Sequence, residues 1–456
     1  MEENKIINDA TPENGGEPHT SHHHHEDSEH HHSSGSHHHE GSEYHHSSSS
    51  HHHSSSSRHH SSSSHHKSRH KRHKHHSSGR KSPKTVPIWV MVVCLLATIA
   101  VFSAAFLSDY LSDHTDEQQL SVPDVELTVT VNNGGGVLVC NAVQQYLAVD
   151  MLNPQNAKIT PYTFYQGERI DGEVPVSLKM SVANSTASYY KIELADNVDF
   201  KDAKEDMIDG KSSTYTFRHL FVNSDYYFRV TAYTPDGIVV STGHFQTANT
   251  PRILTIDGIS NVRDIGNWRT DSGKRIRQGL LYRGTALDGA DEQLYHLTNE
   301  GMIDMLTNLG IKTDMDLRGK SSTTMDALGS RVNHKYYGMV MYEDIFTDNG
   351  KDMVRAIFTE LANPDNYPIY IHCTYGRDRA GTICYLLEAV LGVSQGDCIK
   401  EYGLSNVQPE NILIVQNGLI NNYQGSSLKE KAENYLISCG INEYQIESIR
   451  KIFLED

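Results

Sequence analysis

The sequence is short of cysteine and of positive charge, and each shortage excludes a class of protein. Its 456 residues include only 6 cysteines, and these lack the paired spacing of a zinc ribbon or of a small disulfide-bonded domain. Lys and Arg number 40 against 57 Asp and Glu, which gives a formal net charge of −17. Because clustered Lys and Arg hold a phosphate backbone, this balance argues against nucleic-acid binding.

Residues 1–85 are dominated by histidine and serine and hold 24 of the 30 histidines. A segment with so few apolar residues cannot bury enough surface to offset the entropy of folding, so we predict a disordered tail. Clusters such as His22 to His25 and His51 to His53 could bind Zn²⁺ or Ni²⁺ as neutral imidazoles. The alternative is a solvated low-complexity tail.

A run without charge follows, from Thr85 to Ser108. About 20 apolar residues are enough for a helix that spans a bilayer, so we predict one transmembrane helix at 86–108 rather than a cleaved signal peptide or a core helix. Basic residues precede the run and acidic residues follow it, and positive flanks stay in the cytoplasm. The prediction is a single-pass protein of the cell membrane, with a cytoplasmic N-terminus and residues 109–456 outside.

Beyond this run the pattern changes to the alternation of half-buried strands. Val174, Val176, Leu178, Met180 and Val182 occupy every second position, which places one face on a core and the other in water. Similar stretches separated by turns predict an all-β sandwich at 155–249. Residues 109–154 are predicted to form a linker that could include a β-hairpin.

The all-β region resembles a fibronectin type III domain. Leu220, five further residues and then Tyr226 match the spacing of that family's tyrosine corner, although Val222 and Ser224 replace the usual proline and threonine. The resemblance implies a module that spaces or binds and does not catalyse.

From residue 251 apolar strands alternate with amphipathic helices, which predicts an α/β domain at 251–456. The apolar run 368–371 leads into the segment 372–382, and a helix with apolar residues at helical spacing follows. Cys373 is therefore expected where a strand becomes a loop at a helix N-terminus.

Such a loop points several backbone N–H groups at one spot, which suits a phosphate and favours the thiolate form of a cysteine. Arg379, six positions after Cys373, could hold two phosphate oxygens bidentately. A buried structural cysteine is the alternative for Cys373, and it is the favoured interpretation for Cys384, Cys398 and Cys439.

The segment 372–382 resembles the active-site loop of bacterial protein tyrosine phosphatases of the tyrosine and lipid dual-specificity type, which reads His-Cys-Thr-x-Gly-Lys-Asp-Arg-Thr-Gly. Residues 261–266 resemble that family's Asn-x-Arg-Asp-x-Gly, and residues 316–318 its Asp-Leu-Arg. The resemblance covers 251–456. It implies a cysteine-phosphatase domain, with a central sheet flanked by helices, that hydrolyses phosphomonoesters through a phosphocysteine without a metal or another cofactor.

The resemblance also implies roles for individual residues. Cys373 would be the nucleophile, Asp378 the general acid and Arg379 the phosphate-binding arginine, with Asp344 as an alternative acid on a separate loop. The other implied positions are Thr374, Tyr375, Gly376 and Arg377 for phosphate binding, and His372, Asp264, Asp316 and Arg318 in support. For Asp264 and Asp316, pairing with arginine or capping of backbone is the favoured interpretation.

Two positions depart from the family pattern. Arg377 replaces a lysine, which keeps a positive charge at the loop mouth, and Ala380 replaces a Ser or Thr whose hydroxyl helps the thiolate leave. Slow breakdown of the phosphocysteine therefore stays open. The expected function is a membrane-anchored protein tyrosine phosphatase; a phosphoinositide phosphatase and a catalytically weak surface protein that binds phosphorylated ligands are the alternatives.

Overall fold

The computed structural model describes residues 88–113, 124–132, 136–289, 295–320 and 326–456. The histidine clusters that were predicted to bind metal lie outside these ranges. The chain divides into two compact units, Met1–Leu111 and Ser112–Asp456.

Helix α1 spans Ile88–Asp113 and so contains residues 88–108 of the predicted membrane segment. Thr98 and Ser103 interrupt its apolar residues, and their hydroxyls donate to the carbonyls of Leu95 (2.8 Å) and Ile99 (2.7 Å). In the part of the chain that the structure describes, no helix has both the length and the apolar character that a bilayer crossing requires. The predicted transmembrane helix at 86–108 and the predicted single-pass localisation in the cell membrane are therefore wrong.

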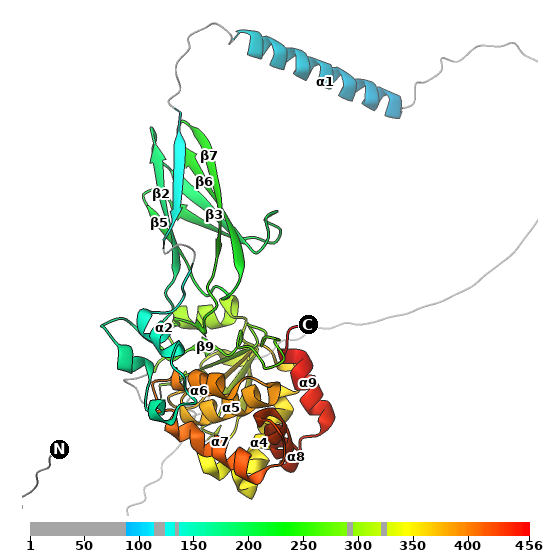
Figure 1. Cartoon of the computed structure of the whole chain (residues 1–456). Helices are drawn as coiled ribbons and strands as arrows, with labels where there is room; N and C mark the ends of the chain where they lie inside the picture. The colour runs from blue at the N-terminus through cyan, green and yellow to red at the C-terminus, as the bar shows by residue number, and fades with distance from the viewer. Residues whose placement is uncertain (1–87, 114–123, 133–135, 290–294, 321–325) are drawn as a thin grey trace, which may run out of the picture. The chain divides into compact units, whose positions relative to one another are not determined.

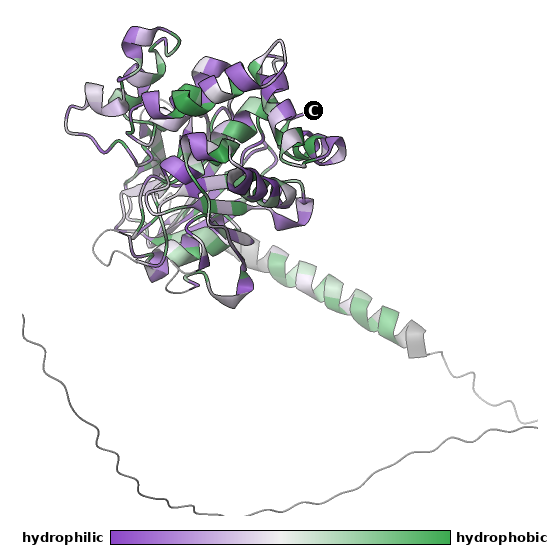
Figure 2. Ribbon diagram, turned by 90° about the horizontal axis from the view of Figure 1, so that it is seen from below, coloured by the Kyte–Doolittle hydropathy of each residue, from purple (hydrophilic) through white to green (hydrophobic). Residues whose placement is uncertain are grey.

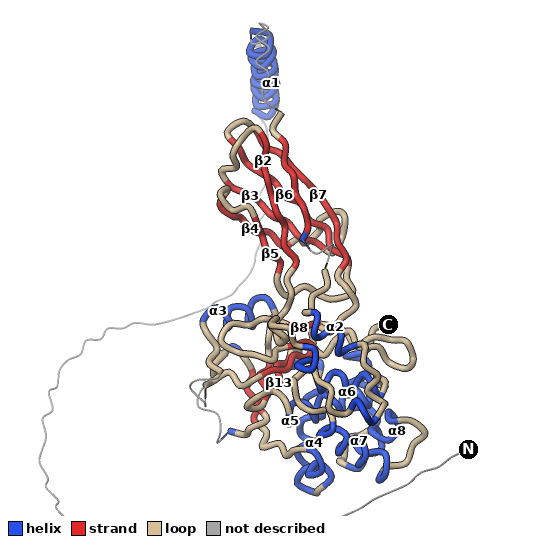
Figure 3. Tube along the Cα trace, turned by 60° about the vertical axis from the view of Figure 1, so that its left-hand side comes forward, coloured by secondary structure: helices blue, strands red, loops and turns tan. Residues whose placement is uncertain are grey.

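Two antiparallel sheets form a β-sandwich in the second unit (Figures 1 and 3). One sheet has the order β1-β2-β5 and the other β4-β3-β6-β7. Alternate side chains from both sheets, including Leu178, Ile192 and Val230, fill the core between them. The strands are β1 Glu126–Val131, β2 Val176–Ala183, β3 Tyr189–Ala195, β4 Lys204–Asp209, β5 Thr214–Phe217, β6 Asp225–Thr234 and β7 Gly237–Gln246.

Tyr226, at the start of β6, ties the sandwich to the loop that precedes it. Its hydroxyl accepts a hydrogen bond from the backbone N–H of Phe221 at 2.8 Å, the kind of contact that a tyrosine corner makes. The assignment of this module to the fibronectin type III family stays a prediction.

The segment between β1 and β2 leaves the sandwich and packs on the α/β part of the unit (Figure 1). It contains α2 Asn141–Leu147 and the 3₁₀ turns η2 Pro154–Asn156 and η3 Pro161–Phe164. Ala142, Val143 and Tyr146 are fully buried in the same hydrophobic core as Cys373. The predicted domain border at residue 155 falls inside this segment, and the domain borders stay predictions.

The α/β part is built on a six-stranded sheet with the order β12-β11-β13-β10-β9-β8. Neighbouring strands from β12 to β10 are parallel, and β9 and β8 add antiparallel strands at one edge. The strands are β8 Arg252–Ile253, β9 Arg263–Asp264, β10 Leu281–Gly284, β11 Thr313–Asp316, β12 Asn333–Tyr336 and β13 Ile369–His372. In an open parallel sheet of this kind, ligands bind beyond the carboxyl ends of the strands.

Helices cover this sheet, and hydrophilic and hydrophobic residues follow one another along them (Figure 2). Helix α5 follows β13 after the loop 373–377 and is almost wholly buried. It ends at Gly392, which has a left-handed φ of 88°. The helices are α3 Asn299–Ile303, the π-helix η4 Asp304–Asn308, α4 Asp348–Leu361, α5 Asp378–Leu391, α6 Gln395–Gly403, α7 Glu410–Asn422, α8 Leu428–Ser438 and α9 Glu443–Phe453, with 3₁₀ turns η6 Gly329–Arg331, η7 Tyr342–Phe346 and η8 Pro364–Asn366.

Candidate active site

Cys373 lies at the carboxyl end of β13, between β11 and β10, and the loop 373–377 connects it to α5. Its side chain is buried, with 2% exposure. The loop turns back at Gly376, whose φ is +65° and whose added Cβ would lie 2.1 Å from the carbonyl oxygen of Gly284. Only glycine fits at this position, because it is both left-handed and in close contact with β10.

The half-buried Asn261 and the buried Arg283 hold the loop's carbonyl groups on one side. Asn261 Nδ2 donates to the carbonyl of Tyr375 at 3.0 Å, and Arg283 Nη2 donates to those of Gly376 at 2.8 Å and Arg377 at 3.0 Å. In a trans peptide the N–H points away from the C=O of the same peptide unit. The N–H groups of residues 376, 377 and 378 therefore point away from Asn261 and Arg283, toward the inner side of the loop. Together with the N-terminus of α5, they suit an anion.

A buried ion network holds Arg283 in place. Its Nη1 lies 2.6 Å from Glu401 Oε2, and Arg263 Nε lies 2.7 Å from the other oxygen of the same carboxylate. Arg263 also donates to Asn261 Oδ1 at 2.7 Å, which links both loop donors to one cluster. Burial alone would raise the pKa of Glu401, but the two guanidinium groups outweigh it and hold that pKa below its ordinary value.

His372, the residue before the cysteine, is paired with an acid on the neighbouring strand. Its Nε2 lies 2.9 Å from Asp314 Oδ1, and both residues are buried. Burial alone would lower the pKa of His372, but the carboxylates of Asp314 and Asp316 outweigh it and raise that pKa above 6.5. Burial would raise the pKa of Asp314, and the imidazoles of His372 and His334 lower it to about 2. The carboxylates thus stabilise the protonated form of the imidazole beside the cysteine.

The Asp-Leu-Arg segment at the end of β11 forms an internal ion pair. Arg318 Nη2 lies 2.8 Å from Asp316 Oδ2, and its Nη1 lies 2.9 Å from Asp288 Oδ1. The carboxylate of Asp316 also accepts from the backbone N–H of Arg318 at 2.8 Å. These contacts agree with the structural interpretation of Asp316.

Asp264 is also a pairing residue, at a different place. Its Oδ2 lies 2.8 Å from Nη1 of the buried Arg252, and its carboxylate accepts from the backbone N–H of Gly266 and Gly279. Arg252 in turn donates to the carbonyls of His219 (2.7 Å) and Leu220 (2.9 Å) in the sandwich. Asp264 thus joins the sandwich to the α/β part rather than contacting the loop.

The two polar residues at the start of α5 differ in how they are held. Arg379 Nη2 lies 3.4 Å from Thr374 Oγ1, which is a long hydrogen bond. The residue is half-buried. Asp378 accepts a hydrogen bond from the hydroxyl of Tyr342, which also lies 2.7 Å from the hydroxyl of Tyr402. The carboxylate of Asp378 is therefore oriented by η7, whereas Asp344 in the same turn has an exposed side chain.

Ala380 is fully buried, and its methyl side chain has no hydroxyl. The hydroxyl of Thr382, which is the nearest one along α5, donates to the carbonyl of Asp378 at 2.8 Å. Burial raises the pKa of the Cys384 thiol to about 12, which agrees with a core role for that residue.

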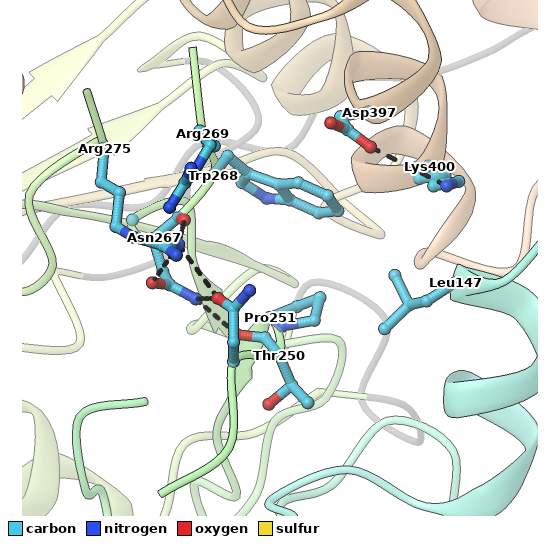
Figure 4. A pocket seen from close by; sticks show the side chains of 11 residues that line it. Leu147, Thr250, Pro251, Asn267, Trp268, Arg269, Arg275, Asp397 and Lys400 are labelled. Atoms are coloured by element: carbon cyan, nitrogen blue, oxygen red, sulfur yellow. Dashed lines mark hydrogen bonds and ion pairs between the residues drawn. The ribbon is translucent and has the colours of Figure 1, made fainter. Parts of the chain in front are cut away.

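A cavity of about 200 Å³ lies away from the loop, where α2 meets the α/β part. Figure 4 shows Trp268 on one wall and Leu147 of α2 on another. Arg275 Nη1 donates to Asn249 Oδ1 at 3.0 Å and to the carbonyl of Asn267 at 2.9 Å. This guanidinium therefore already has hydrogen-bonding partners within the protein. No residue of the loop 373–377 lines this cavity, and it is not part of the candidate active site.

Sequence reasoning missed Glu401 and Tyr342. Glu401 comes from α6, 28 positions after Cys373, and an acid on an amphipathic helix carries no local signal. The segment around Tyr342 was singled out, but for Asp344. In the described residues, no group of three or more His, Cys, Asp or Glu side chains could hold a metal ion.

Residues 254–455 match the model of the tyrosine phosphatase family. A protein of Cupriavidus necator named "Putative tyrosine-protein phosphatase" is 29% identical over 182 residues, which are 34% of this chain and 63% of that protein. A crystal structure of the core catalytic domain of the PP-IP phosphatase SIW14 from S. cerevisiae, in complex with citrate, is 15% identical and covers 35% of this chain and 84% of its own, with a TM-score of 0.23. The two sequence matches support the tyrosine phosphatase family for the α/β region.

Proposed function

We propose that this protein is a protein tyrosine phosphatase that hydrolyses phosphomonoesters through a phosphocysteine on Cys373. The observation that carries the proposal is the loop 373–377 at the carboxyl end of β13. Asn261 and Arg283 bind the carbonyl groups of three of its peptide units, so the N–H groups of these units point to the opposite side, where they and the N-terminus of α5 suit an anion. The tyrosine phosphatase match of residues 254–455 supports the same activity.

In the first step the Cys373 thiolate attacks phosphorus and the bond to the ester oxygen breaks. Asp378 donates a proton to that oxygen, while Arg379 and the loop N–H groups bind the three equatorial oxygens. In the second step water attacks the phosphocysteine, Asp378 takes a proton from the water, and the thiolate leaves. Inorganic phosphate is the product, and the enzyme returns to its starting state.

Asp378 is proposed as the acid in preference to Asp344 because of how each is held. The hydrogen bond from Tyr342 orients the Asp378 carboxylate at the start of α5, one position before Arg379. Asp344 is exposed on the same 3₁₀ turn. A proton donor acts best when it is positioned in advance, and Tyr342 supplies that positioning for Asp378.

Ala380 favours a second candidate, in which turnover is slow and the protein holds phosphorylated ligands. A hydroxyl at this position would stabilise the departing thiolate, and Ala380 cannot supply one. We therefore expect hydrolysis of the phosphocysteine, and not its formation, to limit the rate.

The test is phosphate release by the full chain under reducing conditions with EDTA, using p-nitrophenyl phosphate and a phosphotyrosine peptide. We expect an initial burst of p-nitrophenol followed by slow steady release, and loss of both with Cys373→Ser. Asp378→Asn should reduce release, and Asp344→Asn is its matched control. No release from the wild-type chain, together with retained binding of the phosphopeptide by Cys373→Ser, would favour the second candidate over the enzyme.

A further inference from the structure

The segment 138–172, which forms most of the connection between β1 and β2, is fixed to the α/β part near both of its ends. At its start Tyr146 is fully buried, and its hydroxyl donates to the carbonyl of Lys400 at 3.2 Å. At its end Ile170 is 5% exposed in the α/β core, and the backbone N–H of Glu173 donates to Thr255 Oγ1 at 3.2 Å. This segment is therefore a preformed wall and not a loose linker.

The second half of the segment faces the candidate active site across a cavity of about 250 Å³. The opposite wall contains Arg377, which belongs to the loop that follows Cys373, and Asn261, which donates to that loop. The segment contributes Tyr162, Tyr165, Glu168, Arg169, Ile170 and Asp171 to the lining. A substrate whose phosphoryl group lies in the loop would thus have the rest of its chain beside this cavity.

The acidic side chains of the cavity already have partners within the protein. Both carboxylate oxygens of Glu168 accept backbone N–H groups, from Ala142 and Gln166, each at 2.9 Å. Asp171 Oδ1 lies 3.2 Å from Arg169 Nε, a contact that leaves the Nη groups of Arg169 to donate to a second carboxylate.

The positive charge of Arg377 has no such compensation. Its guanidinium lies 5.5 Å from the ring centroid of Tyr375, and among the described residues it has no acid within ion-pair distance. The cavity therefore favours a negative group.

Two exposed aromatic side chains form the rim. Tyr162 is 60% exposed and Tyr165 is 50% exposed, and their ring centroids are 5.5 Å apart. Tyrosine gives a large contact area at a small entropic cost, and it is enriched where proteins bind peptides and other proteins. An extended peptide that leaves the loop would cross this rim.

We propose that this cavity binds an acidic side chain next to the phosphotyrosine of a protein substrate, with Arg169 and Arg377 pairing with its carboxylate. Tyr162 and Tyr165 pack against the peptide. The proposal rests on the proposed function, since it places the phosphotyrosine in the loop at Cys373. It assigns substrate selection to a segment that is inserted between two strands of the sandwich.

The test measures binding, so that it does not depend on turnover. Full-length Cys373→Ser is titrated with fluorescein-labelled phosphotyrosine peptides that carry Glu or Ala on both sides of the phosphotyrosine, and Kd is read from anisotropy. We expect about tenfold tighter binding of the Glu peptide, the size of one charge-assisted contact. Arg169→Ala should remove this preference, and Lys158→Ala, which removes an exposed cation from the same segment, should keep it. Tyr165→Ala should weaken both peptides, and Tyr444→Ala is its matched control.

Equal Kd values for the two peptides, or a Glu preference that survives Arg169→Ala, would overturn the proposal. A short-chain phosphoinositide that competes more strongly than the Glu peptide, and loses that advantage with Arg169→Ala, would overturn it in favour of a second phosphate. Phosphate release from p-nitrophenyl phosphate by the wild-type chain is measured separately. Its absence would contradict the proposed catalysis while leaving the comparison of Kd values decisive for the cavity.

Discussion

Replacing Glu401 with glutamine removes the negative charge that lies between Arg263 and Arg283 and leaves the shape of the side chain almost unchanged. The carboxylate is fully buried, and its two oxygens lie 2.7 Å and 2.6 Å from the two guanidinium groups. In the variant, one guanidinium faces an amide oxygen and the other faces an amide N–H. Two buried cations would then lack an anion.

Breaking a buried ion pair by removing one partner costs about 3–5 kcal/mol, because an uncompensated charge stays in the interior. We expect Glu401→Gln to lower the free energy of unfolding by that amount. Arg283 also holds the carbonyls of Gly376 and Arg377, so phosphate release should fall by about tenfold or more even where the variant is folded. The assay is urea denaturation of the full chain, followed by the fluorescence of its two tryptophans, of which Trp268 lies in the α/β part.

The matched control is Glu447→Gln, which removes an exposed carboxylate from α9. Surface substitutions of this kind usually stay within about 0.5 kcal/mol. A loss of less than about 1 kcal/mol for Glu401→Gln, or a similar loss in both variants, would refute the view that this network holds the loop.

Three further predictions concern other buried groups. The raised pKa of His372 means that its pairing with Asp314 stabilises the fold fully below pH 6.5, and that this stabilisation is lost as pH rises through the folded-state pKa. This pairing should therefore make the urea midpoint lower at pH 9 than at pH 6, and Asp314→Asn should abolish its contribution. Ala380→Ser should raise steady-state phosphate release about tenfold and shrink the burst, measured by stopped flow, because a hydroxyl can stabilise the leaving thiolate. Arg252→Met leaves the buried Asp264 without its cation and should cost about 3–5 kcal/mol in urea unfolding, with faster proteolysis between the sandwich and the α/β part.

Much of the loop could be predicted because its determinants are local. The apolar strand, Cys373, Gly376 and the amphipathic helix follow one another along the chain, and Gly376 has the left-handed φ that only glycine adopts easily. The supporting network could be predicted only in part. Arg263 stands in the Asn-x-Arg-Asp-x-Gly motif, whereas the role of Glu401 can be seen only when α6 packs behind the loop.

The role of the segment 138–172 could not be predicted, because its anchors are distant along the chain. Tyr146 contacts a carbonyl 254 positions away, and no periodicity in the sequence points to that partner. The membrane prediction failed for a different reason. The prediction relied on the absence of charge over the 24 residues 85–108. A membrane-spanning helix must be both long enough and apolar enough, and no helix in the described ranges meets both conditions.

The most direct test of the central claim is to trap the intermediate. The wild-type chain is mixed with p-nitrophenyl phosphate, quenched in acid within the burst, and digested for mass spectrometry. The account predicts a phosphoryl group on the peptide that contains Cys373, absent in Cys373→Ser and depleted in Ala380→Ser. Phosphate release without a phosphorylated Cys373, or a phosphoryl group on another residue, would contradict it.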